Sequence, residues 1–196
     1  MKLNYRRLSA EDVLAVLTED YRQQCANGDA ASGSTLTLDS TISYWHGALI
    51  ADDWRYDQVG VYLNGLFDTH FSKATWHATL RPYRRTRLRS VCELIASQAV
   101  VADIRPIRIL GRECLAAGAF KAIRERLSAA GADVSDLRPS TSLSDFACRN
   151  FQEVYREFVR LAPRKIPEMR CVMPPNLAAR HALRLVGSVV LAVWAL

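Results

Sequence analysis

This 196-residue chain lacks a Cys-x-x-Cys motif. Its five cysteines are widely spaced: Cys25, Cys92, Cys114, Cys148 and Cys171. This spacing excludes a zinc ribbon and a thioredoxin-type redox site. Separated cysteines in an odd number are typical of reduced thiols that pack as small apolar side chains. We therefore expect a reducing compartment, the cytoplasm.

The common catalytic motifs are missing as well. No GxSxG, Walker-type or GxGxxG segment occurs, which excludes the usual hydrolase and nucleotide-binding signatures. No HExxH occurs either, and the spacing of His46, His70 and His77 matches no usual zinc pattern. We therefore expect neither a metal nor a cofactor, and the sequence favours a protein that is not an enzyme.

A long apolar run is also missing. The N-terminus, MKLNYRRLSAEDVLAVL, has no apolar stretch of signal-peptide length, so secretion is not expected. After Arg184 come twelve uncharged residues, LVGSVVLAVWAL, at positions 185–196. They are fewer than the roughly twenty that span a bilayer. They leave three alternatives: a buried terminal helix, an interfacial segment, or the opening of a membrane helix.

A helix that is apolar on every side lies either in a protein core or in lipid. Of the alternatives for residues 185–196, we expect attachment to the inner face of a membrane. Basic residues precede this segment and would remain on the cytoplasmic side. The rest of the chain is expected to fold without it.

What the chain does contain is a series of helical patterns. Its 49% hydrophobic and 23% charged residues are typical of a globular protein. Ser9, followed by Glu11 and Asp12, predicts a helix start, because a side-chain cap and acidic residues favour that end. Similar patterns predict further helices within residues 39–45, 52–67, 72–80, 86–96, 116–130 and 142–161, with Ser72 as the cap of the third and either Ser142 or Ser144 as the cap of the last. Only residues 104–110, IRPIRIL, read as β, and Pro106 limits them to an edge strand or an extended connector.

These patterns predict a mainly α-helical fold. We expect small orthogonal helical bundles with a short extended connector and an apolar C-terminal helix. Residues 1–99 would form an N-terminal helical bundle and residues 100–170 a second helical module. Residues 171–196 would form a hinge followed by the apolar segment.

Charge is unevenly distributed along the chain. Residues 1–80 carry six basic and ten acidic side chains, a net charge of −4, whereas residues 81–126 carry eleven basic and four acidic side chains, a net charge of +7. Five arginines lie within nine residues of the basic part: Arg81, Arg84, Arg85, Arg87 and Arg89. Guanidinium groups bind phosphates and carboxylates through paired hydrogen bonds. We interpret this arginine cluster as a candidate surface for an anionic ligand or partner, the alternative being a solvated loop that balances the acidic helices.

Cys114 is the candidate reactive thiol. It follows Gly111, Arg112 and Glu113 at an expected helix start, where the helix dipole lowers the pKa of a thiol. A cysteine nucleophile also requires a nearby histidine base and an orienting group.

Two parts of the chain have the order of elements of a carrier protein. AIRERLSAAGADVSDLRPSTSLSDF, residues 122–146, runs from a helix into a long loop. VYLNGLFDTHFSKATW and TRLRSVCELIA, residues 61–76 and 86–96, give an amphipathic, a short and a final helix. In this order the chain resembles the acyl carrier protein family, and the resemblance implies two carrier-like helical modules. In that family, a serine at the start of the central helix carries phosphopantetheine. Here ADDW (residues 51–54) and CRNF (residues 148–151) stand at that point, so the resemblance implies carrier-like bundles without the carrier cofactor.

Together these features favour a non-catalytic helical interaction module. Its partner would be a protein or an anionic ligand bound at the arginine cluster, and residues 185–196 would hold it at a membrane. Specific nucleic-acid recognition is not expected, because no reading helix or stacking motif occurs. The alternative is a carrier-like or accessory protein that binds an acyl or phosphate-bearing ligand in a pocket between helices.

Overall fold

A computed structural model describes residues 3–27, 35–49 and 56–163 of the chain. Within these residues the protein is mainly helical, as predicted, with two short antiparallel sheets. The elements in chain order are β1 (Tyr5–Arg7), α1 (Ala10–Asn27), α2 (Ile42–Leu49), α3 (Tyr56–Phe67), α4 (Lys73–Leu80), α5 (Leu88–Ala96), β2 (Val100–Ala102), β3 (Ile107–Ile109), β4 (Arg112–Cys114), α6 (Leu115–Ala129), α7 (Leu143–Arg149) and α8 (Phe151–Leu161). The predicted hinge, the apolar segment 185–196 and residues 51–54 lie outside the described residues.

Side-chain caps fix several helix starts. At α1, the Asp12 amide donates to Ser9 Oγ and the Ser9 amide donates to Asp12 Oδ2, both at 3.1 Å, which is a reciprocal capping box. Ser72 caps α4 and Ser142 caps α7, each serine oxygen accepting a hydrogen bond from the amide of the residue three positions later. The predicted starts at Ser9 and Ser72 are confirmed, and of the two serines expected for the last helix, Ser142 rather than Ser144 is the cap.

The prediction of a single helix over residues 142–161 is wrong. The chain breaks at Asn150, which leaves helical geometry at φ −130° and ψ 43°, and α7 and α8 lie on either side of it. The amide and the side-chain Nδ2 of Asn150 both donate to the Phe146 carbonyl at 3.2 Å. Asn150 thus supplies hydrogen-bond donors to a carbonyl at the end of α7, at the point where the chain turns into α8.

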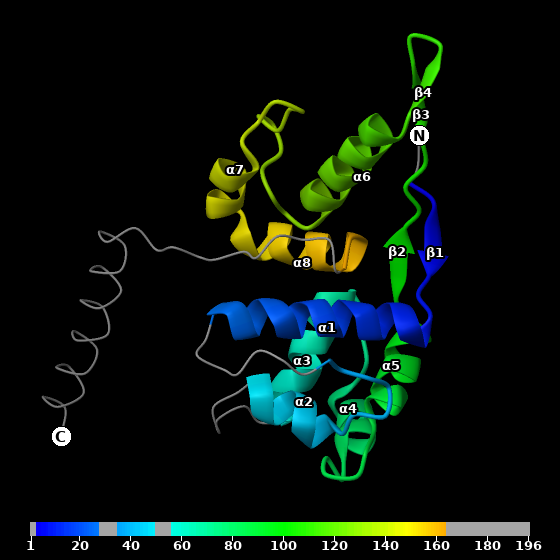
Figure 1. The fold of residues 1–196 in the computed structure, drawn as a ribbon, viewed down its shortest axis with the longest axis vertical. Coiled ribbons are helices and arrows are strands. Elements are labelled where there is room, and N and C mark those ends of the chain that lie inside the picture. Colours follow the sequence, from blue (N-terminus) through cyan, green and yellow to red (C-terminus); the bar gives the residue numbers. More distant parts are fainter. Residues whose placement is uncertain (1–2, 28–34, 50–55, 164–196) are drawn as a thin grey trace, which may run out of the picture.

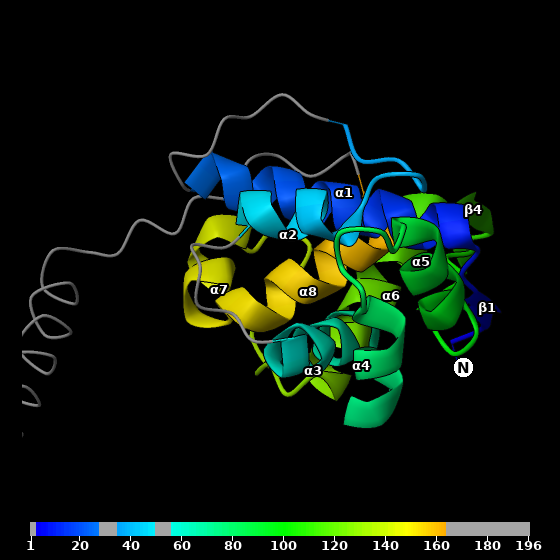
Figure 2. The same ribbon diagram turned by 90° about the horizontal axis from the view of Figure 1, so that it is seen from below.

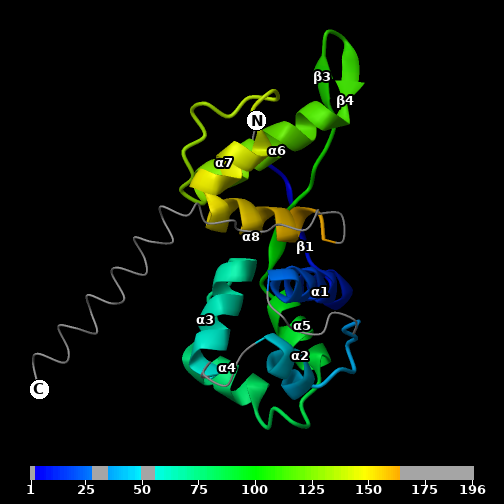
Figure 3. The ribbon, with the colours of Figure 1, turned by 60° about the vertical axis from the view of Figure 1, so that its left-hand side comes forward.

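Sheet structure is more extensive than the sequence predicted. Ile107–Ile109 lies inside the expected extended stretch, but it forms a hairpin with Arg112–Cys114. The pairing of β1 with β2 was not predicted, and it joins the N-terminus to the residues after α5. The hairpin of β3 and β4 projects from the body beyond the start of α6 (Figure 1 and Figure 3).

Helix α8 lies between two groups of helices. It packs against α1 and α3 on one side and against α6 and α7 on the other (Figure 1 and Figure 2). The larger apolar core is built mainly from α1 to α5 and includes Leu17, Trp45 and Phe67. The smaller core lies between α6, α7 and α8 and includes Leu127 and Phe146.

Residues of α8 contribute to both cores. Phe158 packs against both of them, Val159 is fully buried in the larger core and Val154 is buried in the smaller one. Among the described helices, none has both the length and the apolar character needed to cross a membrane.

Candidate functional site

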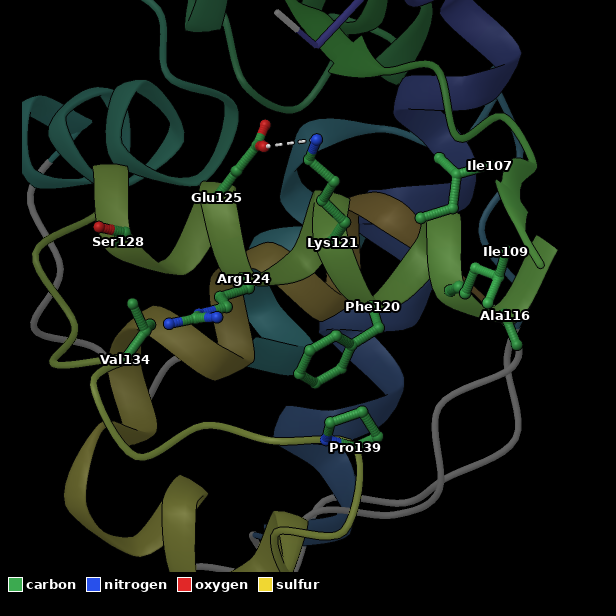
Figure 4. Close-up of a pocket in the computed structure, with 11 residues that line it drawn as sticks. Ile107, Ile109, Ala116, Phe120, Lys121, Arg124, Glu125, Ser128, Val134 and Pro139 are labelled. Atoms are coloured by element: carbon green, nitrogen blue, oxygen red, sulfur yellow. Dashed lines mark ion pairs between the residues drawn. The ribbon is translucent and has the colours of Figure 1, made fainter. Parts of the chain in front are cut away.

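An open pocket of about 810 Å³ lies beside α6. Its walls are apolar and come from three segments: β3 gives Ile107 and Ile109, α6 gives Ala116 and Phe120, and the loop after α6 gives Val134 and Pro139. Figure 4 shows the ring of Phe120 directed toward Pro139 across this space. Clefts of this volume with mostly apolar walls and few polar groups are typical of small-molecule sites.

The close approach of α6 to the connector before β3 helps to place the pocket. Gly118 is buried, and a Cβ atom at this position would lie 2.0 Å from the carbonyl oxygen of Arg105. Only glycine allows the helix to lie this close to the backbone of residues 105 and 106. Gly118 therefore keeps α6 next to the hairpin whose isoleucines form one wall.

Charged side chains line part of the pocket. Lys121 Nζ lies 3.7 Å from Glu125 Oε1, and the two are directed away from Phe120 (Figure 4). Arg124 is exposed, extends toward Val134, and makes no hydrogen bond or ion pair with any part of the chain that the structure describes. The pocket thus combines apolar walls with the guanidinium of Arg124, which is available to bind the carboxylate or phosphate of an acidic head group.

The arginine cluster lies elsewhere, on the chain that leads from α4 into α5. All five of its arginines are exposed. Arg87 and Arg89 are held by residue 39: Arg87 Nη1 donates to the Asp39 carbonyl at 2.5 Å, and Arg89 Nη2 lies 3.4 Å from the Asp39 carboxylate. Both contacts arise because residues 38–41 lie alongside residues 86–89 through backbone hydrogen bonds.

The guanidinium groups of Arg84 and Arg85 remain available. Arg84 lies over the ring of Tyr83, with its Cζ atom 5.7 Å from the ring centroid, and Arg85 has no ion pair within the described residues. An aromatic face attracts a guanidinium group, so the Tyr83 ring helps to orient that of Arg84.

Cys114 lies where expected, at the residue before α6, and is half-buried. Its sulfur makes no hydrogen bond to any described residue, so the base that a cysteine nucleophile needs is not beside it in this part of the chain. Among the described residues, no three histidine, cysteine or acidic side chains gather in a way that could hold a metal ion.

A buried polar network joins three helices that are distant in sequence. Asp20 of α1 is fully buried, and its carboxylate accepts hydrogen bonds from the hydroxyls of Tyr62 in α3 and Tyr155 in α8, the latter at 2.7 Å. Gln24 Nε2 also donates to Asp20, at 2.9 Å. The sequence does not reveal this network, because an acidic residue within an amphipathic helix gives no sign of its burial.

Burial raises the pKa of the Asp20 carboxyl above its ordinary range, and the donated hydrogen bonds oppose that shift. Burial, together with the nearby Asp20 charge, also raises the pKa of both tyrosines. These phenols therefore remain protonated donors, and the network acts as a fixed junction between α1, α3 and α8.

A second buried charge cluster lies on α8. Glu157 accepts two hydrogen bonds of 2.9 Å from Arg126 of α6 and lies 3.5 Å from Arg160. This bidentate pair raises the pKa of Arg126 and fixes α6 on α8. Arg160 also donates to the Val100 carbonyl at 3.0 Å, whereas its Nε atom has no hydrogen-bond partner among the described residues.

No protein family, curated protein or solved structure matches this chain. The resemblance to acyl carrier proteins and the cytoplasmic location therefore stay predictions. Of the expected central-helix positions, residues 148–151 span the break between α7 and α8.

Proposed function

We propose that this protein is a binding module whose pocket beside α6 takes an amphiphilic ligand, an acyl chain that ends in an acidic head group. The observation that carries the proposal is the pocket itself, in which apolar walls from three segments meet Arg124, a side chain with no ion pair in the part of the chain that the structure describes. The chain would lie against Ile107, Ile109 and Phe120, and the acidic oxygens would accept hydrogen bonds from Arg124.

The apolar walls supply affinity and the cation selects the head group. Burial of one methylene stabilises a complex by about 0.8 kcal/mol, so the roughly 8 kcal/mol of micromolar binding would require about ten buried methylenes, the length of a dodecanoyl chain. A guanidinium discriminates because an uncharged head group would leave it without a partner. Selectivity for acidic over neutral head groups is therefore expected to depend on Arg124.

A titration of the full chain with 11-(dansylamino)undecanoic acid tests the proposal. Ala116→Trp places a large side chain at an exposed position of the wall and is expected to lower the affinity by about tenfold or more. Arg124→Gln is expected to weaken displacement of the probe by dodecanoate and dodecyl phosphate, but not by dodecanol.

Arg85→Gln is the matched control, because Arg85 is also exposed and unpaired within the described residues but lies far along the chain, before α5. Unchanged binding in Ala116→Trp, or equal losses in Arg124→Gln and Arg85→Gln, would contradict the proposal. Comparison of dodecanoate with dodecyl phosphate shows whether the site prefers a carboxylate or a phosphate head group.

The arginine cluster supports a second candidate function, which is the binding of an acidic segment of a partner protein. Arg84 and Arg85 are the specific observation, because they are exposed and no described acidic residue neutralises them. This interaction surface and the pocket can coexist, since they lie on different parts of the fold.

A further inference from the structure

The hairpin of β3 and β4 ends in an apolar residue that the fold does not use. Its turn is Leu110–Gly111, and the Leu110 side chain is 99% exposed. The hairpin extends beyond the start of α6 (Figure 1 and Figure 3), and Leu110 lies in the turn at its outer end. An apolar side chain this exposed makes no contribution to either core.

The backbone at this tip makes leucine an unexpected residue. Leu110 has φ 49° and Gly111 has φ 82°, so both turn residues lie in the left-handed region. Two-residue turns of this kind favour Asn-Gly or Asp-Gly, and a branched apolar residue is strained there. Asparagine would fit the turn better and would suit water better. The leucine is therefore best explained by a contact outside the chain.

The residues behind the tip are partly apolar and partly basic. Ile109 and Leu115 are 46% and 59% exposed, respectively. Arg108 and Arg112 are exposed and have no ion pair among the described residues. The strand register places Arg112 opposite Ile109, directly behind the turn, and Arg108 opposite the exposed Glu113 one step further back, so the two strands still carry a net positive charge.

We infer that this hairpin inserts into the surface of an anionic lipid membrane, with Leu110 reaching the acyl boundary and the two arginines at the level of the head groups. The order of the groups carries the inference. An interfacial element needs its apolar group outermost and its cations behind, because lipid head groups lie above the acyl chains. A nucleic acid or an acidic protein groove presents its charges first and would favour cations at the tip.

Cosedimentation of the full chain with vesicles tests this inference. Vesicles of phosphatidylcholine alone are compared with vesicles that also contain phosphatidylserine, and binding is expected mainly to the latter. Leu110→Asp is expected to lower the partition coefficient by about tenfold or more, because one buried leucine is lost and an anion is added. Leu143→Asp is the matched control, since Leu143 is also an exposed leucine, 49% accessible, at the start of α7.

Residues 185–196 are present in every variant, so the membrane attachment expected of them would affect wild type and variants equally. Equal binding of wild type, Leu110→Asp and Leu143→Asp, or no binding of wild type, would overturn the inference. Loss of binding to a DNA duplex in Leu110→Asp, with vesicle binding unchanged, would overturn it in favour of a nucleic acid.

A second variant locates the tip directly. In Leu110→Trp the hairpin keeps an apolar tip, and brominated phosphatidylcholine mixed with phosphatidylserine is expected to quench the additional fluorescence. Quenching no greater than in wild type would show that the tip stays in water and would overturn the inference. Failure of the amphiphile titration leaves this result untouched, because vesicle insertion does not depend on the pocket's ligand.

Discussion

At the scale of single residues, the carboxylates of Asp20 and Asp12 lie in contrasting surroundings. Asp20 is fully buried among two tyrosine hydroxyls and an amide, whereas Asp12 is partly exposed and paired with Arg6 at 2.6 Å. The pKa of Asp20 is raised by burial, and the pKa of Asp12 is lowered, mainly by its hydrogen bond from Arg6. The two residues should therefore respond to pH in opposite ways.

We predict that Asp20→Asn changes the pH dependence of stability in a defined direction. The folded protein binds the Asp20 proton at a higher pH than the unfolded chain, whose aspartate pKa is about 3.9. This contribution to stability is fully present below the unfolded pKa and is lost as pH rises through the folded pKa. On acidification through this window, the free energy of unfolding of wild type should therefore rise relative to that of Asp20→Asn.

Urea denaturation across this pH range measures both proteins, and Asp12→Asn is the control of opposite sign. Its stabilising pair with Arg6 is present above the unfolded pKa and is lost on acidification. The difference between wild type and Asp12→Asn should therefore shrink as pH falls. A pH-independent difference for Asp20→Asn would show that Asp20 does not titrate differently in the folded protein.

We also predict that Gly118→Ala destabilises the protein, because its Cβ would meet the Arg105 carbonyl at 2.0 Å. Relief of this overlap requires α6 to move, at a cost of about 1–3 kcal/mol. Binding of the dansylated probe should weaken as well, since α6 and β3 form facing walls. Gly65→Ala in α3 has open space around it and should instead stabilise by about 0.4–1 kcal/mol. Thermal melts of both variants measure this contrast, and equal effects would contradict it.

At the scale of elements, the sequence predicted helices better than strands. Ser9, Ser72 and Ser142 indicated real helix starts because a cap depends on residues only three positions apart. The strands β1 and β2 have three residues each, and they pair although the five helices α1 to α5 separate them in the sequence. Neither strand therefore has a local pattern. The turn at Leu110–Gly111 was missed for a related reason, because leucine is not the residue that such turns favour.

The arginine cluster also belongs to this scale, since its exposure depends on how residues 38–41 lie beside the start of α5. We predict that replacing Arg84, Arg85 and Arg87 by alanine lowers retention of the full chain on an anionic resin. Retention of wild type should weaken with salt, as expected for exposed charges. Unchanged retention in the triple variant would favour a solvated loop over a partner surface.

At the scale of the whole molecule, α8 determines how the two cores are joined. Its residues enter both cores, Tyr155 reaches Asp20, and Glu157 receives Arg126 from α6. These contacts link residues more than thirty, and in one case 135, positions apart. The pocket was not predictable for the same reason, because Ile107, Phe120 and Pro139 meet only once α6, the hairpin and the following loop have packed.

The most direct test of the proposed function is an NMR measurement on the full chain with methyl-labelled isoleucine, leucine and valine, in complex with dodecanoate. Intermolecular nuclear Overhauser effects from the methylene protons are expected to reach the methyl groups of Ile107, Ile109 and Val134. They should be lost in Ala116→Trp. Effects confined to Val61 in α3 or to the valines and leucines of residues 185–196, with none at the pocket, would contradict the account.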